Sequence, residues 1–223
     1  MKTFTKTLGL SLVSAVFAGS LAFAQDNSST TEKDSVNTPH SKAGLFIEPI
    51  LSASSEETSI KTSQLPLISD DTSGRSDSLG IGARVGFHIS EVVFLGADGR
   101  YGKTKFSDSS YGDADGTMYN YGPTLGFQAP NMGLRIWGTY IFDGQYNPDA
   151  GSNGIDLNFE DAKGFRAGIG FRIAAISLNL EYQEVRYEKT DIQSVGNVAT
   201  NGNSSVDLEN KGAAVSISFP IEL

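Results

Sequence analysis

Apolar and polar residues alternate along the segment from Leu79 to Tyr101 with almost no exceptions. Because successive side chains of a β-strand point to opposite faces, this pattern predicts a hairpin with one apolar face and one face of glycines and charges. The apolar face carries Leu79, Ile81, Ala83, Val85, Phe87, Ile89, Val93, Leu95, Ala97 and Tyr101. A soluble sheet turns such a face to a core, whereas a transmembrane barrel turns it to lipid and fills its lumen with the polar face. The small, glycine-rich polar face of this hairpin favours the transmembrane arrangement.

The same alternation recurs along the chain and predicts eight strands, at 44–52, 79–89, 93–101, 117–129, 134–142, 164–173, 176–183 and 212–223. Long polar loops are predicted at 54–78, where short strand extensions stay open as an alternative, and at 106–115, 143–161 and 188–210, with short turns at 90–91, 130–131 and 174–175. Pro49 cannot donate a ladder hydrogen bond, which predicts a bulge or break in the first strand. Long loops alternate strictly with short turns. The predicted fold is therefore all-β, an eight-stranded antiparallel up-and-down transmembrane β-barrel.

Aromatic residues on the apolar faces divide by type between the two ends of the predicted strands. Tyrosines lie near the long loops, at Tyr101, Tyr119, Tyr121, Tyr140 and Tyr182, and phenylalanines lie near the short turns, at Phe87, Phe127, Phe171 and Phe219. Amphipathic rings settle at the headgroup level, so these residues predict two aromatic girdles. Short turns of such barrels face the periplasm. We therefore expect the long loops to be external.

The segments before the barrel are predicted to serve export. Residues 1–24 have the features of a secretory signal peptide, with Lys2 and Lys6, an apolar stretch at 8–17 and the small-residue site 22–24. Residues 25–42 are polar and lack aromatic residues, which predicts a flexible periplasmic tail. The predicted domains are thus the signal peptide (1–24), the tail (25–42) and a barrel with four long external loops (43–223).

Composition excludes several classes of protein. The chain has no cysteine, which removes disulfides, thiolate metal sites and cysteine nucleophiles. After the N-terminus there is no apolar run of about 18 residues, so we expect no membrane-spanning helix. The formal charge of −9 becomes −11 once Lys2 and Lys6 are removed with the signal peptide. An acidic chain without a basic stripe is not expected to bind nucleic acid.

The signal peptide, the strands of alternating glycine and arginine, and the terminal strand 215–223 resemble small outer-membrane β-barrels of the OmpA/OmpX type. The resemblance implies a location in the outer membrane of a Gram-negative cell envelope. It also implies contact with outer-membrane lipids and lipopolysaccharide, and insertion by the barrel-assembly machinery. Members of this family usually end in an aromatic residue, whereas this chain ends in Leu223.

Charged residues on the inward faces are the candidate site. They are Glu48, Arg84, Asp98, Arg100, Arg135, Arg166, Arg172 and Glu181. Buried charges must be paired and arginine forks suit carboxylates, so one interpretation is an ion-pair network that fills the lumen. The other is a basic constriction that selects anions. An eight-stranded barrel is only just wide enough to be filled by side chains, which favours the filled lumen.

No catalytic, cofactor-binding or metal-binding residue is predicted. His40 lies in the tail and His88 points inward near a short turn, and neither has a serine and acid partner placed near the outer rim, where barrel enzymes work. The glycines at 80–86 do not match a dinucleotide-binding loop, and residues 113–116 lack the later ligands of a calcium loop. We therefore expect a structural or surface-interaction role through the external loops, with a partner that the sequence does not identify. Three further hypotheses stay open: a small anion-preferring pore, an outer-membrane enzyme and a soluble lipocalin-like binding barrel.

Overall fold

The computed structural model describes residues 44–61, 72–108, 112–129, 132–149, 155–195, 198–204 and 207–223. The predicted signal peptide (1–24), the predicted tail (25–42) with His40, and the predicted turn at 130–131 lie outside the described residues. Within the described ranges, no helix is long and apolar enough to cross a membrane.

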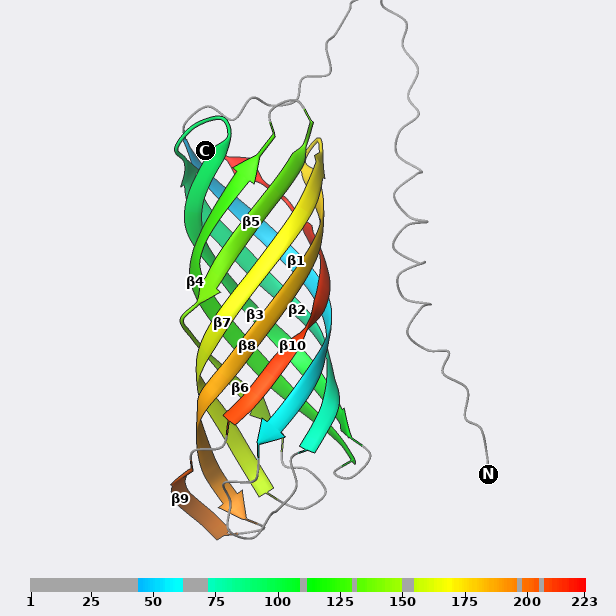
Figure 1. Cartoon of the computed structure of the whole chain (residues 1–223), viewed down its shortest axis with the longest axis vertical. Helices are drawn as coiled ribbons and strands as arrows, with labels where there is room; N and C mark the ends of the chain where they lie inside the picture. The colour runs from blue at the N-terminus through cyan, green and yellow to red at the C-terminus, as the bar shows by residue number, and fades with distance from the viewer. Residues whose placement is uncertain are drawn as a thin grey trace, which may run out of the picture. The chain divides into compact units, whose positions relative to one another are not determined.

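The described chain forms one antiparallel sheet that closes into a barrel of steeply tilted strands (Figure 1). Its strands are β1 (Leu45–Lys61), β2 (Thr72–His88), β3 (Val93–Asp108), β4 (Gly112–Gln128), β5 (Leu134–Ile141), β6 (Asp143–Pro148), β7 (Ile155–Ile173), β8 (Ile176–Val195), β9 (Val198–Ser204), β10 (Asp207–Ser218) and β11 (Ile221–Glu222). β5 and β6 form one wall strand, as do β10 and β11, and β10 pairs with β1 to close the ring. The predicted eight-stranded antiparallel barrel is confirmed.

Tight turns join the wall strands at one end of the barrel, called here the turn end. The predicted hairpin of β2 and β3 closes over residues 89–92, where the Ile89 amide donates to the Val93 carbonyl (2.9 Å). β7 and β8 meet at a two-residue turn in which Ala174 adopts a left-handed φ of 54°. Such turns twist in the same sense as the strands they join. The opposite end, where β1 connects to β2, is called the loop end.

The wall strands run much further toward the loop end than the sequence predicts. Most residues of the predicted loops at 54–78 and 106–115 belong to strands. β1 and β2 extend into the first of these segments, and β3 and β4 extend into the second. The predicted loop at 143–161 contains β6 and the start of β7, and the predicted loop at 188–210 contains the end of β8, all of β9 and the start of β10. These predictions were wrong because serine, glycine and charged residues, which are common in loops, also occupy strands whose outer face meets water. In β1 the paired run continues to Lys61, opposite Asp207 of β10.

The irregularity expected at Pro49 lies on the partner strand instead. Pro49 stays within β1, opposite Ala83 of β2, but it offers no N–H to β10. The break falls across from it, between β10 and β11, where the Phe219 amide still donates to the Pro49 carbonyl (3.0 Å). The pairings on both sides of this break keep one register, so no residue is inserted.

A β-bulge lies at Phe142, between β5 and β6. On β4, Thr124 pairs with Thr139 of β5, while Tyr121 pairs with Asp143 of β6. Three steps along β4 therefore face four steps along the neighbouring strand. The extra residue reverses which side chains point inward, so Tyr146 of β6 is directed into the barrel and is 2% exposed.

Candidate functional site

A belt of apolar side chains covers the outside of the barrel from the turn end to the tyrosines. Large apolar residues are openly exposed here, with Leu79 at 62%, Ile81 at 60% and Ile173 at 61%. The predicted girdle residues Tyr101, Tyr119, Tyr121, Tyr140, Tyr182, Phe87, Phe127, Phe171 and Phe219 all lie on this outer surface. On β2 the belt runs from Leu79 to Phe87, close to the roughly 9–11 residues that a tilted strand needs to cross hydrocarbon. A continuous exposed apolar surface of this height is suited to lipid rather than to water.

Beyond the tyrosines the barrel wall reverses its polarity. This part, called here the outer barrel, comprises residues 54–61, 72–78, 103–108, 112–118, 143–148, 155–164, 183–195 and 207–212. Its exposed outward side chains include Glu57, Arg75, Asp77, Lys103, Lys105, Asp113, Asp115, Lys163, Arg186, Glu188 and Lys211. Lys105 pairs with Asp113 (3.1 Å), and this hydrogen bond lowers the pKa of Asp113 and raises the pKa of Lys105. The outer barrel thus has the charged exterior of a water-soluble sheet.

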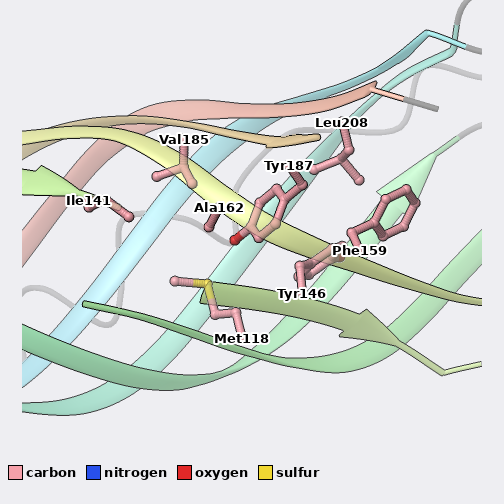
Figure 2. Packing of buried hydrophobic residues seen from close by; sticks show 8 residues of the cluster. All are labelled: Met118, Ile141, Tyr146, Phe159, Ala162, Val185, Tyr187 and Leu208. Carbon is pink, nitrogen blue, oxygen red and sulfur yellow. The ribbon is translucent and has the colours of Figure 1, made fainter. Parts of the chain in front are cut away.

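Inside the outer barrel and at its border with the apolar belt, apolar side chains from five wall strands pack against one another (Figure 2). This outer apolar plug consists of Met118, Ile141, Tyr146, Phe159, Ala162, Val185, Tyr187 and Leu208. Tyr146 lies at its centre, with ring centroids 6.1 Å from both Phe159 and Tyr187. Sequence reasoning placed most of these residues in loops or left them unassigned. The period-two pairs Leu157 with Phe159 and Val185 with Tyr187 are the signal that could have revealed them.

Toward the turn end, the lumen holds buried charges instead of apolar side chains. Seven of the eight predicted inward charges lie here, and we call them the charge network: Glu48, Arg84, Asp98, Arg100, Arg135, Arg166 and Glu181. The least buried of them, Arg100, is only 7% exposed, so water barely reaches any of these groups. They come from six wall strands and meet on the barrel axis because each occupies an inward position of its strand.

Glu48 forms one centre of the charge network. Arg135 donates two hydrogen bonds to its carboxylate (2.8 and 3.0 Å), and Arg84 donates another (3.1 Å). The Ser218 hydroxyl completes the set at 2.6 Å. Two guanidiniums and a hydroxyl therefore satisfy one carboxylate, in the forked geometry that favours arginine over lysine.

Asp98 forms the second centre and contacts three arginines. Arg84 donates to it at 2.9 Å, Arg100 at 2.9 and 3.2 Å, and Arg166 at 2.8 Å. Arg84 also contacts Glu48, so it joins the two centres. Each bond is charge-assisted and lies where solvent cannot screen it.

Glu181 extends the network toward the outer barrel. It accepts hydrogen bonds from Arg100 (3.2 Å) and from the Ser216 hydroxyl (2.5 Å). Arg166 donates to Gln183 (3.0 Å), whose side-chain amide donates to Glu56 (2.6 Å). Sequence reasoning missed Glu56 because it assigned that residue to a loop. With Glu56 included, four guanidiniums face four carboxyl groups.

Arg172, the eighth predicted charge, does not belong to the network. Its guanidinium pairs with Glu222 (3.1 Å) near the turn end and is partly exposed. His88 lies beside them, with its Nδ1 atom 3.3 Å from Glu222. The prediction that Arg172 joins the central charges was wrong. Arg172 occupies the last inward position before the Ala174 turn and therefore lies at the rim.

Aromatic side chains pack against the charge network inside the lumen. Phe46 and Phe94 pack edge to face, with ring centroids 5.7 Å apart, and form a cluster with Trp137. The Arg84 guanidinium lies 4.7 Å from the Trp137 ring centroid, and that of Arg135 lies 5.1 Å from the Phe94 ring centroid. These cation–π contacts place aromatic faces against the buried charges.

The charges of the site are engaged with one another and with aromatic rings. Within the residues that the structure describes, no group of three or more His, Asp or Glu side chains is placed to hold a metal ion. The central carboxylates are engaged by arginines, and the guanidiniums by carboxylates and ring faces. What this arrangement does is occupy the lumen and neutralise its own charge.

Searches against family models and against curated proteins find no match to the chain. Among solved structures, outer membrane protein AlkL is 12% identical with a TM-score of 0.49, and the match covers 89% of this chain and 98% of AlkL. OprG from Pseudomonas aeruginosa is 12% identical with a TM-score of 0.48 and coverage of 82% and 98%. Neisserial surface protein A is 15% identical with a TM-score of 0.40 and coverage of 78% and 96%. These are similarities of fold at low identity, and no property of these proteins is carried over to this chain.

Proposed function

We propose that this chain is an integral outer-membrane barrel whose lumen is closed and whose role is structural or surface-interacting rather than catalytic. One observation carries the proposal. A belt of exposed apolar side chains surrounds a lumen whose central charges are almost inaccessible to water. The belt gives a surface for lipid, and the closed lumen leaves the outer barrel and its connections as the parts that can meet other molecules.

The charge balance of the lumen argues against the anion-preferring pore. That hypothesis depended on five inward arginines facing three acids. Arg172 lies at the rim with Glu222, and Glu56 lies beside the network, so the excess of positive charge disappears. A conducting path would also have to pass the outer apolar plug, where Tyr146 and Tyr187 are 2% and 1% exposed. Two separate seals support the closed barrel.

A lipocalin-like barrel and an outer-membrane enzyme find less support. A lipocalin-like barrel would have an apolar lumen and a polar exterior along its whole height, whereas this barrel has that arrangement only in its outer part. An outer-membrane enzyme needs a reactive group with its partners in an accessible place. His88 is buried at the turn end against the Phe46 ring (5.0 Å). We therefore propose a non-catalytic role.

We propose that the loop end faces the cell exterior and the turn end faces the periplasm. Tight turns at one end and long extensions at the other are the usual arrangement in such barrels. The charged exterior of the outer barrel supports this orientation, because it suits the aqueous side of the outer leaflet. Outer-membrane lipids and lipopolysaccharide are then the immediate neighbours, and the barrel-assembly machinery is the proposed partner during insertion.

Membrane fractionation tests the proposal. We expect the full chain, expressed in a Gram-negative host, to be recovered with the outer membrane and to require detergent for extraction. The folded band on a gel should shift after boiling, because the closed barrel resists unfolding by detergent at room temperature. Recovery as a soluble periplasmic protein without detergent would contradict the proposal and would favour the lipocalin-like barrel.

A further inference from the structure

A shallow groove crosses the outer surface of β2 and β3 where the apolar belt meets the outer barrel. Leu79 lies opposite Lys103 in the register of the two strands, and Ile81 lies opposite Tyr101. These four side chains and Gly80 line the groove, whose volume is about 280 Å³. Leu79 and Ile81 are each at least 60% exposed, so the groove opens outward to the lipid.

Lys103 is unusual among the cations of the outer barrel because no carboxylate of the described residues pairs with it. Six other outward cations of the described residues form ion pairs: Arg75, Lys105, Lys163, Arg186, Lys189 and Lys211. The neighbouring outward acids lie two residues closer to the loop end, on the strands beside β3. Asp77 of β2 is engaged by Arg75 (2.9 Å), and Asp115 of β4 lies opposite Lys105. In the described part of the chain, only Lys61 is comparably unpaired, and it lies at the far end of β1.

The position of Lys103 matches the depth of a lipid headgroup. A lysine at a membrane boundary lays its alkyl stem along apolar surface and extends its ammonium toward water. The stem of Lys103 starts level with Leu79, the last apolar residue of β2, and next to the girdle residue Tyr101. An ammonium without a partner among the described residues attracts, at this depth, an anion carried by the lipid itself.

We propose that Lys103 and this groove bind a lipid of the outer leaflet that carries a phosphate monoester on its headgroup. The phosphate contacts the Lys103 ammonium, and an acyl chain lies over Leu79, Ile81 and Tyr101. This assignment rests on the proposed membrane location and orientation of the barrel. The membrane location alone does not determine which lipid headgroup the barrel binds.

The test measures lipid retention by the full chain in phosphatidylcholine nanodiscs doped with lipid A, using native mass spectrometry. We expect Lys103→Gln to reduce retention of phosphorylated lipid A about fivefold, because one lysine near an anionic surface is worth about 1 kcal/mol. Lys103→Arg should keep most of the retention. Lys61→Gln is the matched control, since it removes the same charge far from the belt, and it should behave as the unmodified chain.

A second arm replaces lipid A with its dephosphorylated form, for which Lys103→Gln should have no effect. Equal loss in Lys103→Gln and Lys61→Gln would contradict the site and indicate only a general effect of charge. Unchanged retention of phosphorylated lipid A by Lys103→Gln would contradict it as well. Either result leaves the proposed function standing if the protein still enters the nanodiscs. Failure of the chain to enter them would overturn that function instead.

Discussion

Asp98 is the residue on which the charge network depends most. It is 1% exposed and accepts hydrogen bonds from Arg84, Arg100 and Arg166, which belong to three different strands. Replacing both partners of a buried ion pair by apolar residues often changes stability little. Removing only one partner leaves the other charge uncompensated in a region that water does not reach, and this is strongly destabilising. Asp98 is one partner to three such charges.

We predict that Asp98→Asn lowers the free energy of unfolding by about 3–5 kcal/mol, the usual cost of breaking a buried pair. The substitution keeps the shape of the side chain and removes its charge, so the loss reports on the arginines. Denaturant unfolding in lipid vesicles measures it. Asp77→Asn is the matched control, since the pair of Asp77 with Arg75 is exposed and should change stability by at most about 1 kcal/mol. A change in Asp98→Asn no larger than in the control would show that water reaches the lumen.

Two glycines on neighbouring strands, one facing the lumen and one facing outward, allow the packing on the two sides of the barrel wall to be compared. A Cβ atom added at Gly168 would overlap the Trp137 ring, whereas one added at Gly138, on the neighbouring strand, would meet no atom within 4 Å. We predict that Gly168→Ala costs about 1–3 kcal/mol through overpacking of the lumen. Gly138→Ala, which only adds a methyl group toward lipid, should leave stability nearly unchanged. Equal unfolding midpoints for the two variants would contradict a tightly filled lumen.

At the scale of elements, the membrane part of the barrel could be predicted from the sequence and the outer barrel could not. In the membrane part every outward position is apolar, small or aromatic, so alternation alone fixes strand, face and register. Gly164 to Ile173 illustrates this, because a slip of one residue would move Arg166 into lipid. The outer part of β1 carries Glu57 outward and Thr58 inward, so hydrophobicity no longer alternates. Its strands are held by pairing with their neighbours, which a single segment does not reveal.

The site was predicted to a similar extent. The inward charges followed from their period of two, and seven of the eight meet in the lumen. Arg172 was assigned to the same group because sequence gives the face of a strand but not the depth along the axis. Glu56 and Tyr146 were missed for another reason. Glu56 lies beyond the apolar belt. Tyr146 follows the bulge at Phe142, after which even-numbered instead of odd-numbered residues point inward.

The long strands predict that the outer barrel is a stable wall. Backbone amides that pair between strands and lie around a packed interior exchange slowly with solvent. We therefore expect amides of 54–60, 102–106 and 183–187 to be protected in hydrogen–deuterium exchange, nearly as well as those of the apolar belt. Leu208→Ala, which removes a buried side chain of the outer apolar plug, should raise exchange in the outer barrel alone. Rapid exchange of these segments in the unmodified chain would mean that they behave as loops.

At the scale of the whole molecule, three groups of side chains fill the barrel. The aromatic cluster of Phe46, Phe94 and Trp137 packs against the charge network, and the outer apolar plug fills the part beyond the network. Each group excludes water for a different reason: ring packing, pairing of charge and apolar filling. An eight-stranded barrel leaves no more room than side chains can fill. Closure is thus a property of the whole barrel, and no single residue controls it.

Planar bilayer recording tests this closure most directly. Purified full-length protein is inserted into a neutral bilayer, and insertion is verified separately by the heat-dependent gel shift of protein recovered from matching vesicles. Because the central charges are paired and both the aromatic cluster and the outer apolar plug are packed, we predict no steady conductance in symmetric salt. Steady, anion-selective single-channel currents that disappear in Arg84→Gln or Arg166→Gln would contradict a sealed lumen and would identify the charge network as a selectivity filter.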